Sequence, residues 1–269
     1  MLLPCPEMNT LVRISAALGI LAFASLGSAV RAVPQRNPTQ VLVMGMIHGA
    51  HRSNEKWSLA AVENALRRIH PDVVCAEIPP DRWDRVWRDF DQRGVIEDSR
   101  VKRFPEYTDV LLPLKKELGF AVEPCAAWTQ TMSDARNQRL YEFDTDPKWA
   151  KKKAAYEREN EAVSRRRKAS PIDEDDPLVI HSEEYDRRTR EELEIYDRYL
   201  NDLIGPGGWT NINRAHYRLI DAAIRRHPGQ RMLIMFGAGH KYWILDQLRR
   251  RHDIELVDIR PYLATDRVP

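Results

Sequence analysis

The sequence predicts an α/β fold in which helices flank a central, mostly parallel β-sheet. Apolar, β-branched runs alternate with stretches of helical period at both ends of the chain, which is typical of parallel sheets. Each end also carries a Gly-x-x-His motif directly after an apolar run, so two similar strand–GxxH–helix–strand units are expected. A charged segment without strand patterns lies between them and indicates a helical insertion. With 269 residues, 43% of them hydrophobic, the chain has enough apolar surface for a full core.

The first half of the α/β domain is expected to cover residues 33–133. Leu59, Val62 and Leu66 recur at helical spacing, and Pro71 prevents that helix from continuing. Gly119 is expected to end a later helix, because glycine readily adopts the left-handed conformation that follows a helix. The expected elements are, in order, a strand at 40–47, a helix at 57–69, a strand at 72–77, helices at 81–90 and 107–118, and a short strand at 120–123.

Residues 134–204 form the charged insertion, and residues 205–269 form the second half of the α/β domain. The insertion contains two charged helical stretches separated by a loop with Pro171 and Pro177. The insertion is expected to serve either as a cap over a site or as a dimerisation arm. A homodimer is therefore one expectation. After it, the expected elements are a helix at 212–226, a strand at 231–236, a helix at 242–250 and a strand at 254–259.

The N-terminal 32 residues have the layout of a secretory signal peptide. Arg13 precedes an apolar run at 14–26, and small residues follow that suit cleavage after Ala29 or Ala32. The run is short for a membrane span, so no stable span is expected after cleavage, and the protein is expected to be secreted or periplasmic. The remaining chain has 40 basic and 39 acidic residues, a balance that argues against a nucleic-acid partner.

Two histidines follow strands in matching contexts. Gly45 and His48 in the front unit have the same spacing as Gly237 and His240 in the back unit. Ligands bind at the carboxyl edge of open α/β sheets, where both histidines are expected to lie. The glycines, including Gly239, are predicted to let the backbone turn sharply and let another group come close.

Carboxylates end the second strand of each unit. Glu77 closes the run DVVCAE and Asp258 closes IELVD, so four polar groups are expected to converge on one crevice. Arg82, shortly after the first of these carboxylates, and Arg214, on the helix at 212–226, are candidates to stabilise an oxyanion or grip a substrate. His51, together with Asp258, is a candidate substrate contact.

The other histidines have simpler explanations. Three of them, His70, His227 and His252, lie in basic clusters at helix ends, where cations complement the helix dipole. His216 falls inside a predicted helix and His181 inside the insertion, and both are interpreted as ordinary polar positions. Cys75 and Cys125 could form one disulfide. The position of Cys75 in the middle of a strand favours instead a free thiol that serves as a small core residue.

Paired Gly-x-x-H motifs, a glutamate ending PDVVCAE, an arginine soon after and GAGH near the C-terminus resemble the TraB/TIKI/GumN family. That family belongs to a superfamily with the erythromycin esterases and the ChaN haem-binding lipoproteins. The resemblance covers about residues 40–90 and 205–260. The loop HGAHRSN departs from the simpler loop of TraB and GumN proteins, and the chain has no lipobox.

The resemblance implies a site built from His48, Glu77 and His240, with Arg82 and Arg214 as analogues of the family's arginines. The TIKI type is similar to a metal-dependent peptidase, the esterases use histidine as a base on water, and the ChaN type binds haem. The same three residues are therefore the expected metal ligands.

The sequence thus leads to the hypothesis of an exported hydrolase that acts on a peptide or ester bond of a small-molecule or peptide substrate. Two imidazoles and a carboxylate suffice to hold one divalent metal (Mn, Zn or Co) with an open position, or one histidine serves directly as a base. The alternatives are a non-catalytic ligand- or haem-binding protein of the ChaN type, and a regulatory protein with an inactive site. Covalent catalysis is not expected, because no G-x-S-x-G motif is present.

Overall fold

A computed structural model of the protein describes residues 37–264, which belong to one compact unit. The expected signal peptide lies outside these residues. In the described part of the chain, no helix is both long enough and apolar enough to cross a membrane. Cys75 and Cys125 are both buried and carry free thiols.

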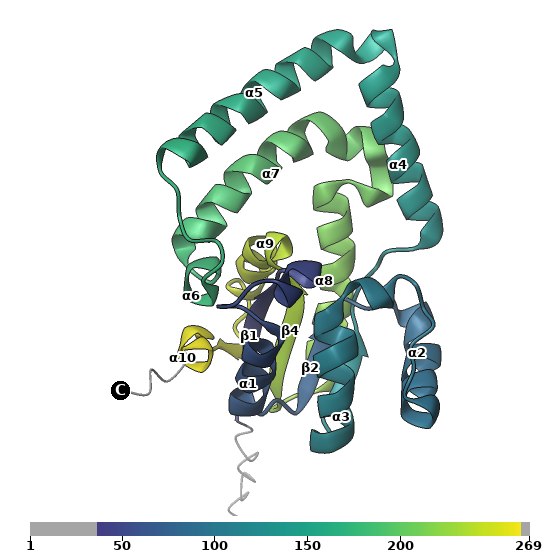
Figure 1. Cartoon of the computed structure of the whole chain (residues 1–269), viewed down its shortest axis with the longest axis vertical. Coiled ribbons are helices and arrows are strands. Elements are labelled where there is room, and N and C mark those ends of the chain that lie inside the picture. Colours follow the sequence, from purple (N-terminus) through teal and green to yellow (C-terminus); the bar gives the residue numbers. More distant parts are fainter. Residues whose placement is uncertain (1–36, 265–269) are drawn as a thin grey trace, which may run out of the picture. The chain divides into compact units, whose positions relative to one another are not determined.

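The centre of the molecule is a parallel five-stranded sheet (Figure 1). The strand order is β3-β2-β4-β1-β5, and every neighbouring pair is parallel. The predicted α/β class is therefore confirmed. The strands are β1 (Thr39–Met46), β2 (Val73–Ala76), β3 (Ala121–Pro124), β4 (Arg231–Gly237) and β5 (Ile254–Leu256).

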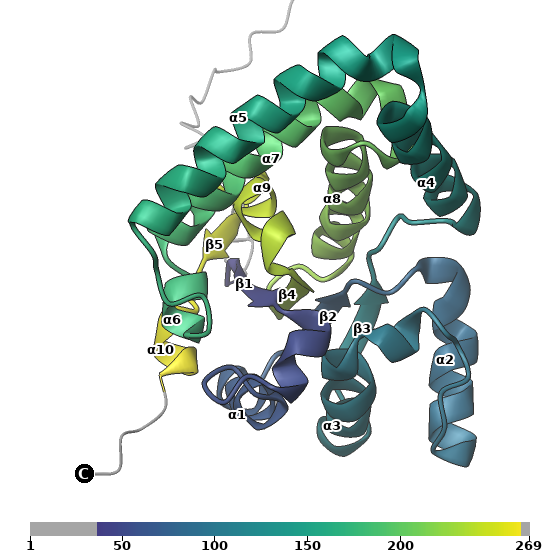
Figure 2. The same cartoon turned by 45° about the horizontal axis from the view of Figure 1, so that its top comes forward.

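The central strands are apolar at nearly every position because both faces of the sheet are covered. Alternate residues of β1 enter two different cores: Leu42 and Met44 on one face, Val41 and Val43 on the other. Figure 2 shows the sheet between α1 and α3 on one side and α8 and α9 on the other. The helices of the α/β part are α1 (Leu59–Ile69), α2 (Pro80–Arg93), α3 (Leu112–Leu118), α8 (Trp209–Arg226), α9 (Ala238–Leu248) and α10 (Arg260–Leu263).

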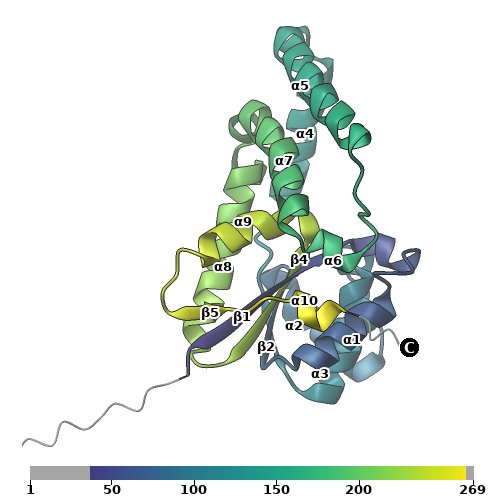
Figure 3. The same ribbon diagram turned by 90° about the vertical axis from the view of Figure 1, so that its left-hand side faces the viewer.

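The charged middle segment is helical, as expected, and lies beyond the carboxyl edge of the sheet (Figure 3). Its helix α7 packs against α8 and α9, while Asn54, in the loop after β1, donates a 3.0 Å hydrogen bond to Asp175 of the insertion. The insertion therefore contacts the edge where the predicted site residues lie. Its helices are α4 (Gln130–Thr145), α5 (Ala150–Ala169), α6 (Pro177–Ile180) and α7 (Glu183–Ile204).

Two predicted elements differ in detail. The helix expected at 107–118 begins as a π-helical turn at Glu106–Leu111 before it continues as α3. The helix expected at 242–250 begins earlier, at Ala238, directly after β4. His240 is therefore in the first turn of α9, and not in a loop before it.

Two of the three glycines of the motifs serve close packing, and none of the three adopts a left-handed turn. A Cβ on Gly45 would lie 3.1 Å from the Cα of Ala238, and a Cβ on Gly237 would lie 2.6 Å from the Nε2 of His48. At Gly239 a Cβ would meet only ordinary contacts, the nearest at 3.7 Å, because that residue is helical. The expectation of a sharp turn at these glycines is corrected, whereas the expected close approach holds at the first two.

Candidate functional site

His48, Glu77 and His240 lie at the same edge of the sheet because β1, β4 and β2 are adjacent and parallel. His48 follows the end of β1, Glu77 follows β2 directly, and His240 is in the first turn of the helix after β4. Residues from both halves of the chain therefore meet at the centre of the sheet. The site lies at the carboxyl edge, where ligands bind in folds of this class.

Glu77 is the central group of this cluster, and it is only 7% exposed. Its Oε2 accepts a 2.9 Å hydrogen bond from the backbone N–H of Gly237, at the N-terminus of α9, where the helix dipole favours a negative charge. Burial opposes its ionisation, but the imidazoles of His240, His48 and His216 and this N–H together hold its pKa below the usual value. Glu77 is therefore a carboxylate at neutral pH.

His240 directs a lone pair at this carboxylate. The amide nitrogen of Asn213 donates to the carbonyl of Trp209 at 2.8 Å, so its Oδ1 faces His240 and accepts from Nδ1–H at 2.7 Å. The free Nε2 lies 3.9 Å from Oε1 of Glu77, and the indole of Trp209 stacks on the imidazole with centroids 4.6 Å apart. Burial lowers the pKa of His240 despite the charge of Glu77, which keeps this lone pair available.

The ring of His48 is also held through Nδ1, but by Glu106 and not by an asparagine. Its Nδ1–H lies 2.6 Å from Oε1 of Glu106, a fully buried carboxylate, and its Nε2 lies against Gly237. Burial lowers the pKa of His48, but the hydrogen bond to Glu106 and the charges of Glu77 and Glu106 outweigh it and raise that pKa. The residue has a left-handed backbone with φ of 52°, an uncommon conformation that concentrates at functional sites.

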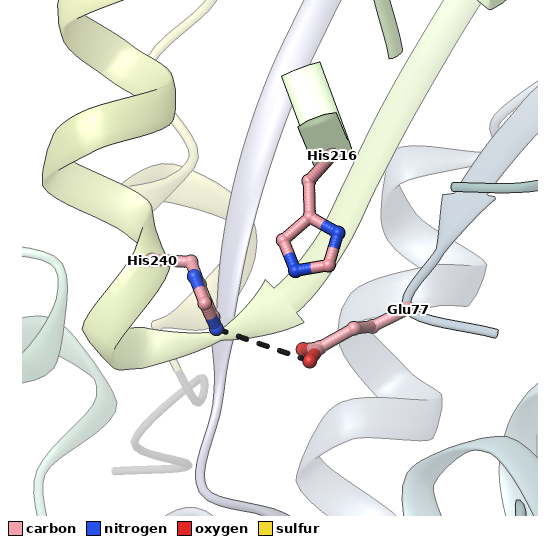
Figure 4. Close-up of side chains that lie close together, drawn as sticks. All are labelled: Glu77, His216 and His240. Carbon is pink, nitrogen blue, oxygen red and sulfur yellow. Dashed lines mark ion pairs between the residues drawn. The ribbon is translucent and has the colours of Figure 1, made fainter. Parts of the chain in front are cut away.

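His216 of α8 also belongs to the cluster, although its place inside a helix predicted only an ordinary polar position. One ligand atom each from Glu77, His216 and His240 lies within 4.8 Å of the others, so this triad is close enough to hold a metal ion (Figure 4). Nδ1 of His216 accepts a 2.8 Å hydrogen bond from the backbone N–H of Ala127. Burial and the charge of His240 lower the pKa of His216 to about 3, so its ring is neutral at physiological pH.

A signal for His216 is present in the sequence. Trp209, Asn213, His216 and Ile220 follow one another at three- and four-residue spacing, so the two polar residues fall on the buried face of α8. Asn213 and His216 are both 0% exposed. Polar residues on the apolar stripe of a helix need a partner or a function.

Two predicted arginines have other places in the structure. Arg82 donates to the buried carboxylate of Asp98 at 2.9 Å, an ion pair that fixes the loop after α2. Arg214 is on the exposed side of α8, and among the described residues it forms no hydrogen bond or ion pair. Neither side chain contacts Glu77, His48 or His240 among the described residues, so their assignment to the site stays a prediction.

Arg100 is the arginine whose charge reaches the cluster. Its guanidinium is 5.9 Å above the ring of Trp128, which itself packs against His216. Burial lowers the pKa of Arg100, and the charge of Glu77 opposes that shift. Its Nε is buried without a partner among the described residues. The sequence did not identify it, because it lies in an irregular segment before a short 3₁₀ turn.

The two predicted substrate contacts also lie outside the cluster. His51 is 1% exposed and uses both nitrogens within its own loop: Nε2 accepts from the N–H of Ile47 at 3.0 Å, and Nδ1 donates to the carbonyl of Trp57 at 2.6 Å. Asp258 lies after β5 at the sheet's outer edge and is ion-paired with Arg260 at 2.8 Å. Neither therefore forms a hydrogen bond or ion pair with Glu77 among the described residues, and their role as substrate contacts stays a prediction; the prediction that Asp258 joins Glu77 in one crevice is corrected.

Comparison with known proteins adds no relative. No protein-family model, no curated protein and no solved structure matches this chain. The resemblance to the TraB/TIKI/GumN family therefore stays a prediction that depends on the motifs alone.

Proposed function

We propose that this protein is an exported hydrolase that cleaves a peptide or ester bond, with water activated at Glu77 and His240. The observation that carries this proposal is the orientation of the polar atoms. Nδ1–H of His240 is held by Asn213 and Nδ1–H of His48 by Glu106, so each ring presents Nε2 to the region of Glu77. Imidazoles fixed through one nitrogen by an oxygen acceptor, beside a carboxylate, are typical of metal and general-base sites.

We further propose that Glu77 and His240 hold one divalent ion of the Mn, Zn or Co type, with His48 as a third ligand that must move closer, because His48 is not among the described residues whose ligand atoms lie within 4.8 Å of one another. Each of the three has a lone pair that it does not use within the protein, and the oxygens behind the two rings are the outer partners that metal-binding histidines require. Such an ion, when bound, supplies Lewis-acid polarisation of a carbonyl and lowers the pKa of water. Glu77 and His240 also retain a role of their own, because either can accept a proton from water.

Arg100 replaces Arg82 and Arg214 as the cation that would stabilise the developing oxyanion. Its charge acts on Glu77, and its partly buried position strengthens interactions with an anion. The aromatic rings of Trp128 and Trp209 flank His216 and His240 and provide apolar walls for a substrate. Neither Cys75 nor Cys125 is accessible as a nucleophile, since both are buried in the core of the sheet.

The haem-binding alternative has less support from the geometry. An axial ligand needs an open face beyond its Nε2, but that atom of His240 points at Glu77, 3.9 Å away, and Trp209 covers the face of the ring. A bound haem would nevertheless be visible as a Soret band, so one experiment distinguishes the two functions.

The test is to purify the chain from Val33 onward without a histidine tag and to measure its metal content and visible spectrum. We expect about one divalent ion per chain, no Soret band, and loss of the ion in both His48→Ala and His240→Ala. His252→Ala, an exposed histidine in a basic cluster, is the matched control and should retain the ion. A colourless protein that neither contains nor takes up metal would refute the metal site, and a Soret band would support the haem binder.

Catalysis is tested separately with libraries of peptide and ester substrates on the metal-loaded protein. Hydrolysis that is lost in Glu77→Gln and retained in His252→Ala is the expected result. If no substrate is cleaved while the metal is bound, the hydrolase proposal fails and a binding function takes its place.

A further inference from the structure

His216 has one polar atom that nothing in the described structure satisfies. The residue is 0% exposed, and its Nδ1 accepts from the N–H of Ala127 at 2.8 Å. A backbone N–H only donates, so Nδ1 must carry the lone pair and the proton of the neutral ring must be on Nε2. That Nε2–H has no hydrogen-bond partner among the described residues. A buried unpaired donor destabilises the folded protein, which is the reason to expect that something binds it.

The orphan donor faces two acceptors. The outer nitrogen of His216 points toward the gap between His240 and Glu77 (Figure 4). Nε2 of His240 and Oε1 of Glu77 are 3.9 Å apart, which is too far for a direct hydrogen bond. Two acceptors and one donor around a small gap match the hydrogen-bonding capacity of one water molecule, whose two protons and one lone pair would all be used.

We propose that His216 is a fixed hydrogen-bond donor to the nucleophilic water, and not a metal ligand. As a ligand it would need its lone pair on Nε2, which would move the proton to Nδ1 and break the hydrogen bond from Ala127. This role distinguishes His216 from His48 and His240, whose Nδ1–H groups donate to oxygens. The inference rests on the proposed hydrolytic function for its chemistry, but its geometry does not depend on it.

The donor orients the water for attack. In the metal-free site one lone pair of the water is bound to His216 and its protons are directed to Glu77 and His240, so the second lone pair is free to form the bond to the carbonyl carbon. When an ion occupies Nε2 of His240, only Glu77 accepts a proton from the water. One proton passes from the water to Glu77, and the π electrons of the carbonyl move to its oxygen. When they return, the bond to the leaving group breaks, and the leaving group takes the proton from Glu77. His216 keeps its own proton throughout.

Nuclear magnetic resonance of ¹⁵N-labelled histidines tests the geometry without any need for activity. We expect His216 to be protonated at Nε2 and unprotonated at Nδ1, with a cross-peak from its Hε2 to a long-lived water. Addition of Zn²⁺ should shift Nε2 of His240 and leave the proton of His216 in place. A proton on Nδ1, loss of Hε2 with Zn²⁺, or absence of the water cross-peak would each overturn the proposal. His216→Phe assigns the signals.

Matched variants test the catalytic contribution. His216→Gln retains an N–H donor at this position, whereas His216→Phe keeps a planar ring without one. We expect kcat to fall about 100-fold in the phenylalanine variant and less than 10-fold in the glutamine variant, with KM and metal content unchanged in both. Equal losses in the two variants would contradict the donor role. If the wild-type protein hydrolyses nothing but the water cross-peak is present, the proposed function fails and the bound-water site survives.

Discussion

The two Gly-x-x-His units look equivalent in the sequence, yet the polar groups beside the two motif glycines are paired differently in the structure. In the front crevice, formed by Glu77, His216 and His240, the N–H of Gly237 donates to Glu77 at 2.9 Å. The lone pair on Nε2 of His240 and the Nε2–H of His216 have no hydrogen-bond partner among the described residues. In the back crevice, lined by His181, Asp186, Lys241 and Asp258, the N–H of Gly45 donates to Nε2 of His181 at 2.8 Å, in the corresponding position.

The back crevice is a structural joint between the insertion and the sheet. His181 uses both ring nitrogens, since Nδ1 also contacts the carbonyl of Pro177 at 2.6 Å. Lys241, next to His240 in the sequence, is 2% exposed and forms an ion pair with Asp186 of α7. The cavity there, of about 240 Å³, is lined by these groups and by Asp258. The comparison shows that a repeated motif becomes a candidate site only where its polar atoms are left unpaired.

The sharpest test of this difference is to neutralise the carboxylate of each crevice. Glu77→Gln should lower kcat/KM by about 10³-fold or more, because it removes the proton acceptor and a metal ligand. Asp258→Asn should leave kcat/KM within about twofold, since that carboxylate only pairs with Arg260. Steady-state hydrolysis and metal content are measured for both. Comparable losses would mean that the crevices share the function.

Substitutions in the back crevice are expected to lower the free energy of unfolding and not the activity. Lys241→Met leaves Asp186 partly buried without its partner, so the free energy of unfolding is expected to fall by about 3 kcal/mol in urea titrations. The double variant Lys241→Met with Asp186→Leu should recover much of that loss, because no charge is left unpaired. A single variant as stable as the wild type would show that the pair does not join the insertion to the sheet.

Substitution of the two motif glycines, Gly45 and Gly237, is expected to have smaller effects, one mainly on stability and the other mainly on activity. Gly237→Ala places a Cβ 2.6 Å from Nε2 of His48, so the imidazole must move and kcat/KM should fall about 100-fold. Gly45→Ala meets the backbone of Ala238 at 3.1 Å, and we expect mainly a loss of about 1–3 kcal/mol in stability. Thermal unfolding and kinetics on the same samples separate the two effects. An active Gly237→Ala protein would place His48 outside the reaction.

The smallest expected effect concerns pH. Burial and the charge of Lys241 lower the pKa of His181 from 6.5 to about 3, so the unfolded state binds a proton more readily than the folded state. The stability from this neutral ring is complete above pH 6.5 and is lost as pH falls toward 3.

His181→Gln keeps an acceptor for the N–H of Gly45 and removes this titration. The variant should be less stable than the wild type by about 1 kcal/mol at pH 7, and this difference should shrink below pH 6.5 and reverse before pH 4, because only the wild type loses stability through this titration. Urea midpoints across that range provide the measurement. A wild type that gains stability relative to the variant on acidification would have the wrong sign for a neutral buried histidine.

Much of the fold was predictable because the signals are local. The apolar runs of β1 and β4, the helical stripe of α1 and the charged helices of the insertion each follow from the order of residues within one segment. The motif histidines and the strand-end glutamate were predictable for the same reason, since each directly follows a strand. Their meeting at one edge required only that the strands be parallel and close together.

The differences between prediction and structure have a common physical origin in contacts between distant segments. The position of Asp258 depends on β5 pairing with the outer side of β1, whereas β2 pairs with β4 and brings Glu77 to the centre. Arg82 was assigned to the site, and in the structure it pairs with Asp98, sixteen residues later. No pattern within either segment predicts these pairings.

The sequence by itself determined the α/β class, the places of the strands and the chemical character of His48, Glu77 and His240, because these depend on spacing and residue type. Only the tertiary structure decided which nitrogen of each histidine is free, that His216 and Arg100 join the cluster, and that His181 and Lys241 close the other crevice. Those properties depend on partners far away in the chain, such as Ala127, Asn213 and Asp186, and packing alone brings them together.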